Sequence, residues 1–299
     1  MAALHGDAGP PVPPLLVLSL GVVAISFGAI FVRLAEAPAL VTAAYRVGLA
    51  SVLLAPAACW RSRDELAGLG RRDAALASLA GFFLALHFAT WIASLDYTSV
   101  ANSVVLVNTN PIWVGLLGPL LTGERLRRRT AGCILLSVMG AIIIGWGDLA
   151  TGGTALYGDA LALAGSVCAA CYLLIGRNLR ARVSLLAYIL LCYGSAAGFL
   201  WIAVLGLKLE FTGFSATTWA AFGGMAVFSQ LVGHSSYNWA LKWLRTSTVA
   251  ISLLGEPIGA SLLAWMIFGE ALTATKLVGG VLVLTAIYLI AREEMHAQH

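Results

Sequence analysis

The chain has 299 residues, of which 60% are hydrophobic and only 11% charged, and its mean hydropathy is +0.90. A soluble domain carries roughly 25% charged residues, so this composition excludes an ordinary soluble enzyme or binding module. The net charge of +4 comes from arginines in short loops without a basic face or an aromatic platform, and we predict no nucleic-acid partner. Lipid satisfies no backbone polar group, and the long, uninterrupted apolar runs predict membrane-spanning helices rather than barrel strands.

In chain order, residues 1–14 contain glycines and four prolines, which predicts a short disordered cytoplasmic tail. Apolar runs of about 20 residues, the length that crosses a bilayer, then follow one another. We predict an all-α integral membrane protein with ten transmembrane helices, at residues 15–35, 40–60, 74–95, 99–120, 130–147, 156–176, 184–206, 216–240, 247–268 and 275–292. The links between them are short and leave no room for a soluble domain.

The placement of lysine and arginine predicts the orientation in the membrane. With the N-terminus inside, fourteen of the 18 basic residues fall in inside loops, three fall in outside loops, and Arg46 lies within the second span. Cytoplasmic loops carry an excess of basic residues, so we predict that both termini are cytoplasmic. The high alanine and arginine usage suggests a bacterial source, for which we expect the inner (plasma) membrane. Ten spans can enclose a cavity within one chain, so we expect a monomer.

The sequence repeats itself at an offset of 146 residues. Pro111-Ile112 falls on Pro257-Ile258, and the pattern P-I-x3-L-L-x5-G-E-x-L occurs in each half at the same spacing. We predict two five-helix domains, at residues 15–147 and 156–292. Because five is an odd number, equivalent helices cross the bilayer in opposite directions. Inverted repeats of this kind are typical of alternating-access transporters, which bind a solute near the membrane midplane between the two halves.

Two short segments of the repeat carry a family resemblance. Residues 122–126 (TGERL) and 254–258 (LGEPI), the latter followed by FGE at 268–270, resemble the EamA repeats of the drug/metabolite transporter superfamily. Arg46 in the second span, which follows Pro38, also resembles the pattern of this family. The resemblance extends from about residue 15 to residue 290. It implies a ten-helix transporter, and within the family the chain is similar to bacterial exporters of aromatic and other neutral amino acids.

The third and eighth spans carry polar residues at helical spacing. His87 and Trp91 lie four residues apart in the third span, as do Gln230, His234 and Asn238 in the eighth. Residues four apart share one face of an α-helix, and a shift of 147 places His87 on His234. Polar groups inside a bilayer are costly, so we predict that the two faces line one substrate cavity. Hydrogen bonds that only hold the helices together are the alternative.

Prolines interrupt the fourth and ninth spans at equivalent positions of the repeat. Pro111 and Pro257 each remove a backbone hydrogen bond, and Asn110 and Glu256 precede them near the predicted membrane midplane. We predict a hinge at each proline, with Asn110 and Glu256 in the substrate site together with Asn102 of the fourth span. A packing kink that does not move is the alternative.

The charged and aromatic candidates allow more than one role. Glu256 can bind a substrate ammonium or carry a proton, or it can be a structural hydrogen-bond acceptor. Arg46 lies about 9 Å into its helix, close enough for its side chain to reach the membrane interface, so structural anchoring and binding of a substrate carboxylate both fit. Trp91 and Trp113 offer flat apolar surfaces to a substrate side chain.

Several functions therefore remain to be compared. An exporter of aromatic and other neutral amino acids is the leading prediction, and an exporter of drugs, purines or other metabolites with the same fold is the alternative. An intramembrane enzyme is disfavoured because HExxH, GxSxG and paired-aspartate motifs are absent from the sequence, and we predict no catalytic residue, metal or cofactor. The inverted repeat argues against an open channel. Uncoupled uniport by alternating access remains an alternative.

Overall fold

The computed structural model describes residues 9–98, 100–123, 126–145, 154–269 and 271–297, and every regular element in those ranges is helical. Of the predicted tail, residues 1–8 lie outside the described residues. The helices of the first half are α1 (Pro14–Leu34), α2 (Ala39–Arg61), α3 (Arg63–Gly68), α4 (Arg71–Ser94), α5 (Val100–Val107), α6 (Asn110–Leu121) and α7 (Arg128–Gly145). Those of the second half are α8 (Ala155–Arg180), α9 (Leu185–Gly206), α10 (Ala216–Gly224), the π-helix η2 (Met225–His234), α11 (Ser235–Ala240), α12 (Thr246–Leu253), α13 (Gly255–Phe268) and α14 (Ala274–Ala297).

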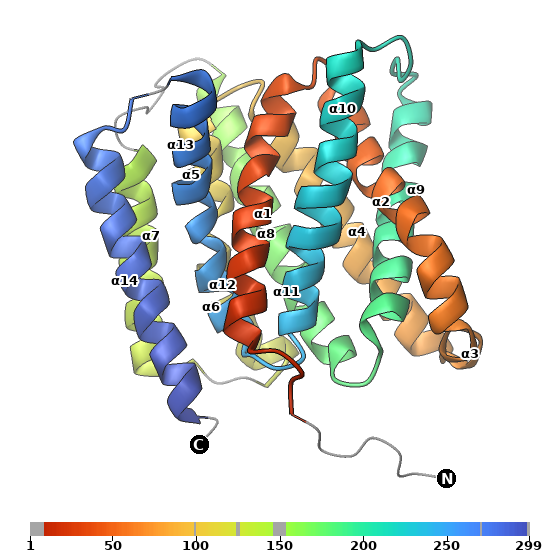
Figure 1. Cartoon of the computed structure of the whole chain (residues 1–299), viewed down its shortest axis with the longest axis horizontal. Coiled ribbons are helices and arrows are strands. Elements are labelled where there is room, and N and C mark those ends of the chain that lie inside the picture. The colour runs from red at the N-terminus through yellow and green to blue at the C-terminus, as the bar shows by residue number, and fades with distance from the viewer. Residues whose placement is uncertain (1–8, 99, 124–125, 146–153, 270, 298–299) are drawn as a thin grey trace.

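The helices form one bundle, with the described ends of the chain at the same edge (Figure 1). In the described part of the chain, six segments are long and apolar enough to cross a membrane: α1, α2, α4, α8, α9 and the successive helices α12 and α13 taken together. The fold is therefore a helical membrane fold, and the count of ten crossings remains a prediction.

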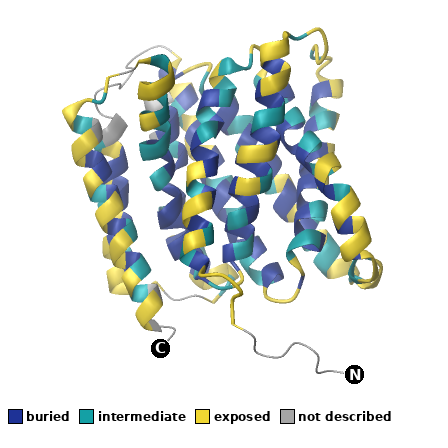
Figure 2. Cartoon of the chain, viewed as in Figure 1, coloured by how far each residue is buried: buried dark blue, intermediate teal, exposed yellow. Residues whose placement is uncertain are grey.

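Exposed residues lie along the outside of the bundle (Figure 2), and many of them are large apolar residues. Some apolar side chains of the helices are between 71% and 81% exposed, namely those of Leu120, Leu156, Ile202 and Met266. Such a surface is unfavourable in water and suits lipid. The polar residues that lie within the spans are mostly turned inward instead.

Four predicted elements differ from those observed, and one of these is the ninth span, which is two helices, α12 and α13. The fourth predicted span is two helices, because Pro111 lacks the N–H that would continue α5 into α6. The eighth contains the π-helix η2, whose wider turns hydropathy does not reveal. The link between the second and third spans contains the short helix α3, which has acidic residues in its first turn.

The two proline breaks occur at matching positions of the sequence repeat. A shift of 146 carries the bounds of α5, Val100–Val107, onto those of α12, Thr246–Leu253. α6 and α13 then begin beside Pro111 and Pro257. The sequence predicted both interruptions, and the structure places them at the positions of the prolines; whether they move remains a prediction.

Glycines allow the central helices to approach closely. α4 packs on α8 and α9, α1 packs on η2 and α13, and α7 pairs with α14 at one edge (Figure 1). A Cβ atom at Gly81 of α4 would lie 2.3 Å from the carbonyl oxygen of Cys192 in α9, so only glycine fits there. Gly165 of α8 similarly lies against His87 and Trp91 of α4. This contact brings the backbone of α8 next to the candidate site.

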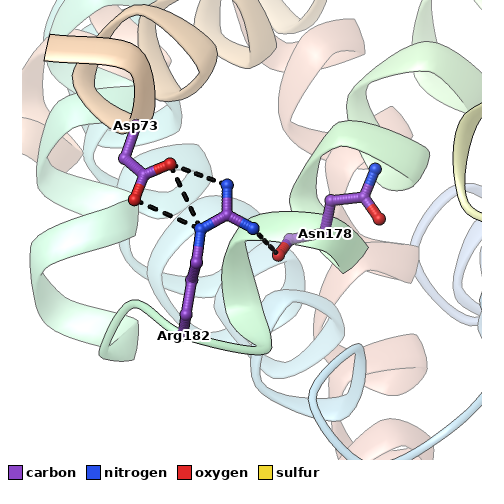
Figure 3. A network of polar contacts seen from close by, with 3 residues as sticks. All are labelled: Asp73, Asn178 and Arg182. Carbon is purple, nitrogen blue, oxygen red and sulfur yellow. Dashed lines mark hydrogen bonds and ion pairs between the residues drawn. The ribbon is translucent and has the colours of Figure 1, made fainter. Parts of the chain in front are cut away.

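A polar network joins α4 to the last turn of α8 and the turn that follows it (Figure 3). Arg182, in the turn after α8, donates from Nη2 to Asp73 of α4 at 2.7 Å and from Nη1 to the carbonyl of Asn178 at 3.1 Å. Asn178 in turn donates to the carbonyl of Leu121, at the end of α6, at 2.8 Å. The last turn of α8 thus ties α4 and α6 together.

Candidate substrate site

A small cavity lies in the middle of the bundle, where the broken helices of both halves meet. It contains about 40 Å³ of free space, which is room for water but not for an organic solute. Its lining comprises Ile25, Arg46, His87, Phe88, Trp91, Val107, Asn108, Asn110, Ala169, Tyr172, Leu173, His234, Tyr237, Leu253 and Glu256. Residues from both copies of the repeat therefore share one enclosed space.

Arg46 of α2 is the cation of the cavity. Its side chain is 1% exposed, its Nε donates to Oε1 of Gln230 at 3.0 Å, and its guanidinium carbon lies 4.0 Å from the ring centre of Phe88. Nη1 and Nη2 are buried and lack a hydrogen-bond partner. The suggestion that Arg46 extends to the membrane interface is therefore wrong, because Gln230 and Phe88 hold the side chain inside the bundle. A buried guanidinium with two free nitrogens can bind a carboxylate through both of them.

Glu256 supplies the opposite charge. It lies in the first turn of α13, where the helix dipole favours a carboxylate, and is 8% exposed. It attracts Arg46 electrostatically. The backbone carbonyl of Glu256 accepts a hydrogen bond from Ser26 of α1 at 3.5 Å, which fixes this turn against α1. The cavity thus contains one cation and one anion that do not satisfy each other's hydrogen-bonding groups.

Asn110 occupies the position in α6 that Glu256 occupies in α13. It is 4% exposed, and its Oδ1 has no hydrogen-bond partner. Both residues line the cavity from the first turn after a proline break. The structure therefore brings the two repeat-related residues to one cavity, and their role in substrate binding remains a prediction. The side chain of Asn102, also predicted for the site, lies outside the described residues.

The two predicted histidines meet across the cavity, with ring centres 6.4 Å apart. His87 Nδ1 lies 3.0 Å from the carbonyl oxygen of Gly165, and because a carbonyl only accepts, Nδ1 is the protonated nitrogen. The ring of Trp91 is stacked parallel to that of His87 at 6.2 Å. His234 is 5% exposed, and its Nδ1 has no partner. The cavity wall is thus formed by planar rings with a few polar edges.

Three predicted residues do not line the cavity. Gln230 lies behind it and orients Arg46. Asn238 also lies behind it, where its Nδ2 donates to the hydroxyls of Tyr172 at 2.6 Å and Tyr193 at 3.1 Å. Trp113 packs against the hydrophobic core, and its indole nitrogen has no partner. Gln230 and Asn238 thus bond to lining residues, and in the described structure none of the three lines the cavity itself.

The π-helix explains why Gln230 and His234 both turn inward. In η2 each turn contains more than four residues, so side chains four apart lie almost one above the other. Ser229, Gln230, Gly233 and His234 are all buried as a result. Gln230 and His234 thus both lie on the buried side of η2, although of the two only His234 lines the cavity.

Nine lining residues are outside the predicted set, and four of these are polar or aromatic: Phe88, Asn108, Tyr172 and Tyr237. Tyr172 is a polar residue within an apolar span, so the rule that singled out the histidines would have found it. Asn108 donates to the carbonyl of Val104 at 2.9 Å in the last turn of α5. Phe88 has no sequence signal, because only its contact with Arg46 distinguishes it from the other phenylalanines.

The EamA-like transporter family model matches residues 13–146 and again 156–292. Two proteins of Archaeoglobus fulgidus, each described as an uncharacterized transporter, are 26% identical over 94% of this chain and 97% of their own, and 27% identical over 76% and 80%. The uncharacterized transporter YyaM of Bacillus subtilis is 22% identical over 82% of each chain. One crystal structure superposes with a TM-score of 0.77 over 96% of this chain and 99% of its own, at 16% identity, and so shares the fold.

Two copies of one family pattern thus account for most of this helical membrane chain, and the relatives above are described as transporters. The chain belongs to the EamA-like transporter family.

Proposed function

We propose that this transporter exports neutral amino acids, aromatic ones included, by alternating access through the central cavity. The observation that carries the proposal is the pair Arg46 and Glu256, one cation and one anion that line the same buried space. Burying two charges is costly unless something satisfies them. A zwitterionic amino acid does so without adding net charge.

Each end of an amino acid has a partner of matching chemistry. The free Nη1 and Nη2 of Arg46 suit the substrate carboxylate, and Glu256 suits the ammonium group. The free Oδ1 of Asn110 can accept a further ammonium hydrogen. The rings of Phe88 and Trp91 offer apolar surface to the side chain of the substrate.

The cavity must widen before such a solute fits. Pockets for organic ligands measure about 300–1,000 Å³, and this one encloses about 40 Å³. The breaks beside Pro111 and Pro257 lie at the cavity in both halves and supply places where the helices can bend. We infer that bending at these two positions, in turn, opens the site to opposite sides of the membrane.

The proposed topology follows from the basic residues. We propose ten crossings, as two inverted five-helix repeats at 15–147 and 156–292, with both termini in the cytoplasm and the chain a monomer in the bacterial inner membrane. The arginine-rich loops at 61–72, 124–129 and 177–182 support this orientation.

The test is counterflow of labelled phenylalanine, tryptophan and threonine in proteoliposomes that contain the purified chain. We expect saturable exchange that is lost in Arg46→Gln and in Glu256→Gln and kept in the exposed controls Arg63→Gln and Glu210→Gln. Competition with phenylalanine methyl ester and with 3-phenylpropionate separates the two ends of the substrate. In the wild type both compounds should compete more weakly than phenylalanine, because the ester lacks the carboxylate and 3-phenylpropionate lacks the ammonium group.

Each alternative gives a different result. Exchange that survives both cavity substitutions would reject the site and keep the function. Well-folded protein that exchanges no amino acid but exchanges a purine or a drug would reject the substrate class. The controls distinguish either outcome from a general loss of folded protein.

A further inference from the structure

A second, larger cavity lies between the first turns of α7 and the last turns of α14, two helices that pair at the edge of the bundle (Figure 1). Its volume is about 860 Å³, and it shares no lining residue with the substrate cavity. Six basic or acidic side chains line it: Arg127, Arg128, Arg129, Arg292, Glu293 and His296.

The positive charges of this cavity are not balanced. Among the residues that the structure describes, Glu293 is the one carboxylate that lines it, and it is already shared by Arg127 at 3.3 Å and by Arg245 at 3.7 Å. In the part of the chain that the structure describes, Arg128, Arg129 and Arg292 have no ion-pair partner. Arginines from the two helices thus face one space with positive charge in excess, which suits an anionic ligand with several acceptor oxygens.

The cavity continues into apolar surroundings. Its deeper wall contains Cys133 and Leu136 of α7 and Leu289 of α14. Leu136 lies eight residues beyond Arg128, which is about 12 Å further along the helix. Leu289 is 45% exposed on the outer surface of the bundle, so the deep part of the cavity adjoins the lipid. The ligand that matches this space has an anionic head and an apolar tail.

We propose that this cavity binds an anionic phospholipid of the leaflet on the side of the chain termini. The phosphate group lies among Arg128, Arg129 and Arg292, and the first acyl methylenes lie along Leu136 and Leu289. Basic pockets between transmembrane helices bind anionic lipid headgroups in this manner. A free phosphate ion would contact the arginines but would leave the apolar wall uncovered. α7 and α14 come from opposite repeats, so the bound lipid joins the two halves.

The experiment measures lipid binding by the full chain, independently of transport. The purified protein in neutral detergent is titrated with phosphatidylglycerol, phosphatidylcholine or inorganic phosphate, and both the thermal midpoint and the lipids retained in native mass spectrometry are recorded. The test variant carries Arg128→Gln, Arg129→Gln and Arg292→Gln. The matched control removes three exposed arginines of the same edge, at Arg63, Arg71 and Arg72.

We expect phosphatidylglycerol to bind and to raise the midpoint of the wild type and of the control. In the test variant its affinity should fall roughly a hundred-fold, since each basic residue near an anionic headgroup contributes about five-fold. Equal binding of phosphatidylglycerol by the test variant, equal binding of phosphatidylcholine by the wild type, or an equal effect of inorganic phosphate would overturn the proposal. Counterflow in phosphatidylcholine vesicles checks that the test variant is folded, and its result leaves the lipid measurement unaffected.

Discussion

The Nε atom of Arg46 donates to Oε1 of Gln230 at 3.0 Å, while both terminal nitrogens of the guanidinium stay free. One amide thus holds a buried cation in place without neutralising it. The arrangement keeps the two nitrogens available to a substrate that carries a carboxylate. It also makes Gln230, which does not touch the cavity, important for how the site binds.

Replacing Gln230 tests this orienting role. In Gln230→Glu the new carboxylate pairs with Arg46 and competes with the substrate, so amino-acid affinity should fall by about ten-fold or more. Gln230→Leu should weaken binding to a similar degree, because the guanidinium is no longer positioned. Ser229→Ala is the control, since Ser229 is buried beside Gln230 and makes no hydrogen bond. Equilibrium binding of labelled phenylalanine checks the prediction, and unchanged affinity in both variants would contradict it.

Neutralising one charge of the cavity should cost more stability than neutralising both. Glu256→Gln leaves Arg46 as an uncompensated buried cation, so its unfolding free energy should fall by up to about 3 kcal/mol. The double variant Arg46→Gln/Glu256→Gln should recover most of that loss and still fail to exchange amino acids. Thermal unfolding in detergent measures the difference. A double variant less stable than either single one would show that the charges do not act as a pair.

Supplying a backbone N–H at the proline breaks should slow transport more than it weakens binding. Pro111→Ala and Pro257→Ala allow hydrogen bonds to the carbonyls of Val107 and Leu253, which favours a continuous helix. Pro56→Ala, inside α2 and away from the cavity, is the control. Exchange rates compared with equilibrium affinity separate the two effects. If the exchange rate and the equilibrium affinity fall together, the prolines shape the site and are not hinges.

Gly81 should not tolerate a methyl group. A Cβ atom there would lie 2.3 Å from the carbonyl oxygen of Cys192 and 2.3 Å from Oγ of Ser195, so α4 and α9 would have to separate. We expect Gly81→Ala to lower the unfolding free energy by about 1–3 kcal/mol. Gly194→Ala on α9 is the control, because nothing lies within 4 Å of its added methyl group. Thermal midpoints of the two variants in the same detergent provide the comparison.

The surface pair of Arg182 and Asp73 should matter much less. The two side chains are 46% and 24% exposed, and solvent screens such pairs to within about 1 kcal/mol. Asp73→Asn should therefore change the thermal midpoint little, and the exchanged pair Asp73→Arg/Arg182→Asp should restore it. A loss as large as that expected for Glu256→Gln would show that this network holds the helices together.

Much of this architecture could be predicted because lipid imposes simple rules on sequence. Apolar runs predicted the helices, and a repeat offset of 146 predicted matching breaks at Pro111 and Pro257. The same rules singled out His87, His234 and Glu256, since polar groups persist inside a bilayer only where something satisfies or uses them. These predictions depend on composition and periodicity, which are local properties of the chain.

Tertiary structure alone decided which of those polar groups meet. Helix length cannot tell whether Arg46 extends to the interface or turns inward, because the answer depends on Gln230 and Phe88, far away in the sequence. Nor does spacing predict that Asn238 contacts two tyrosines behind the wall rather than a substrate. The sequence by itself determined that the chain is a helical, duplicated membrane protein. Packing decided where the charged side chains point, because neighbouring residues occupy the other positions that a side chain could take.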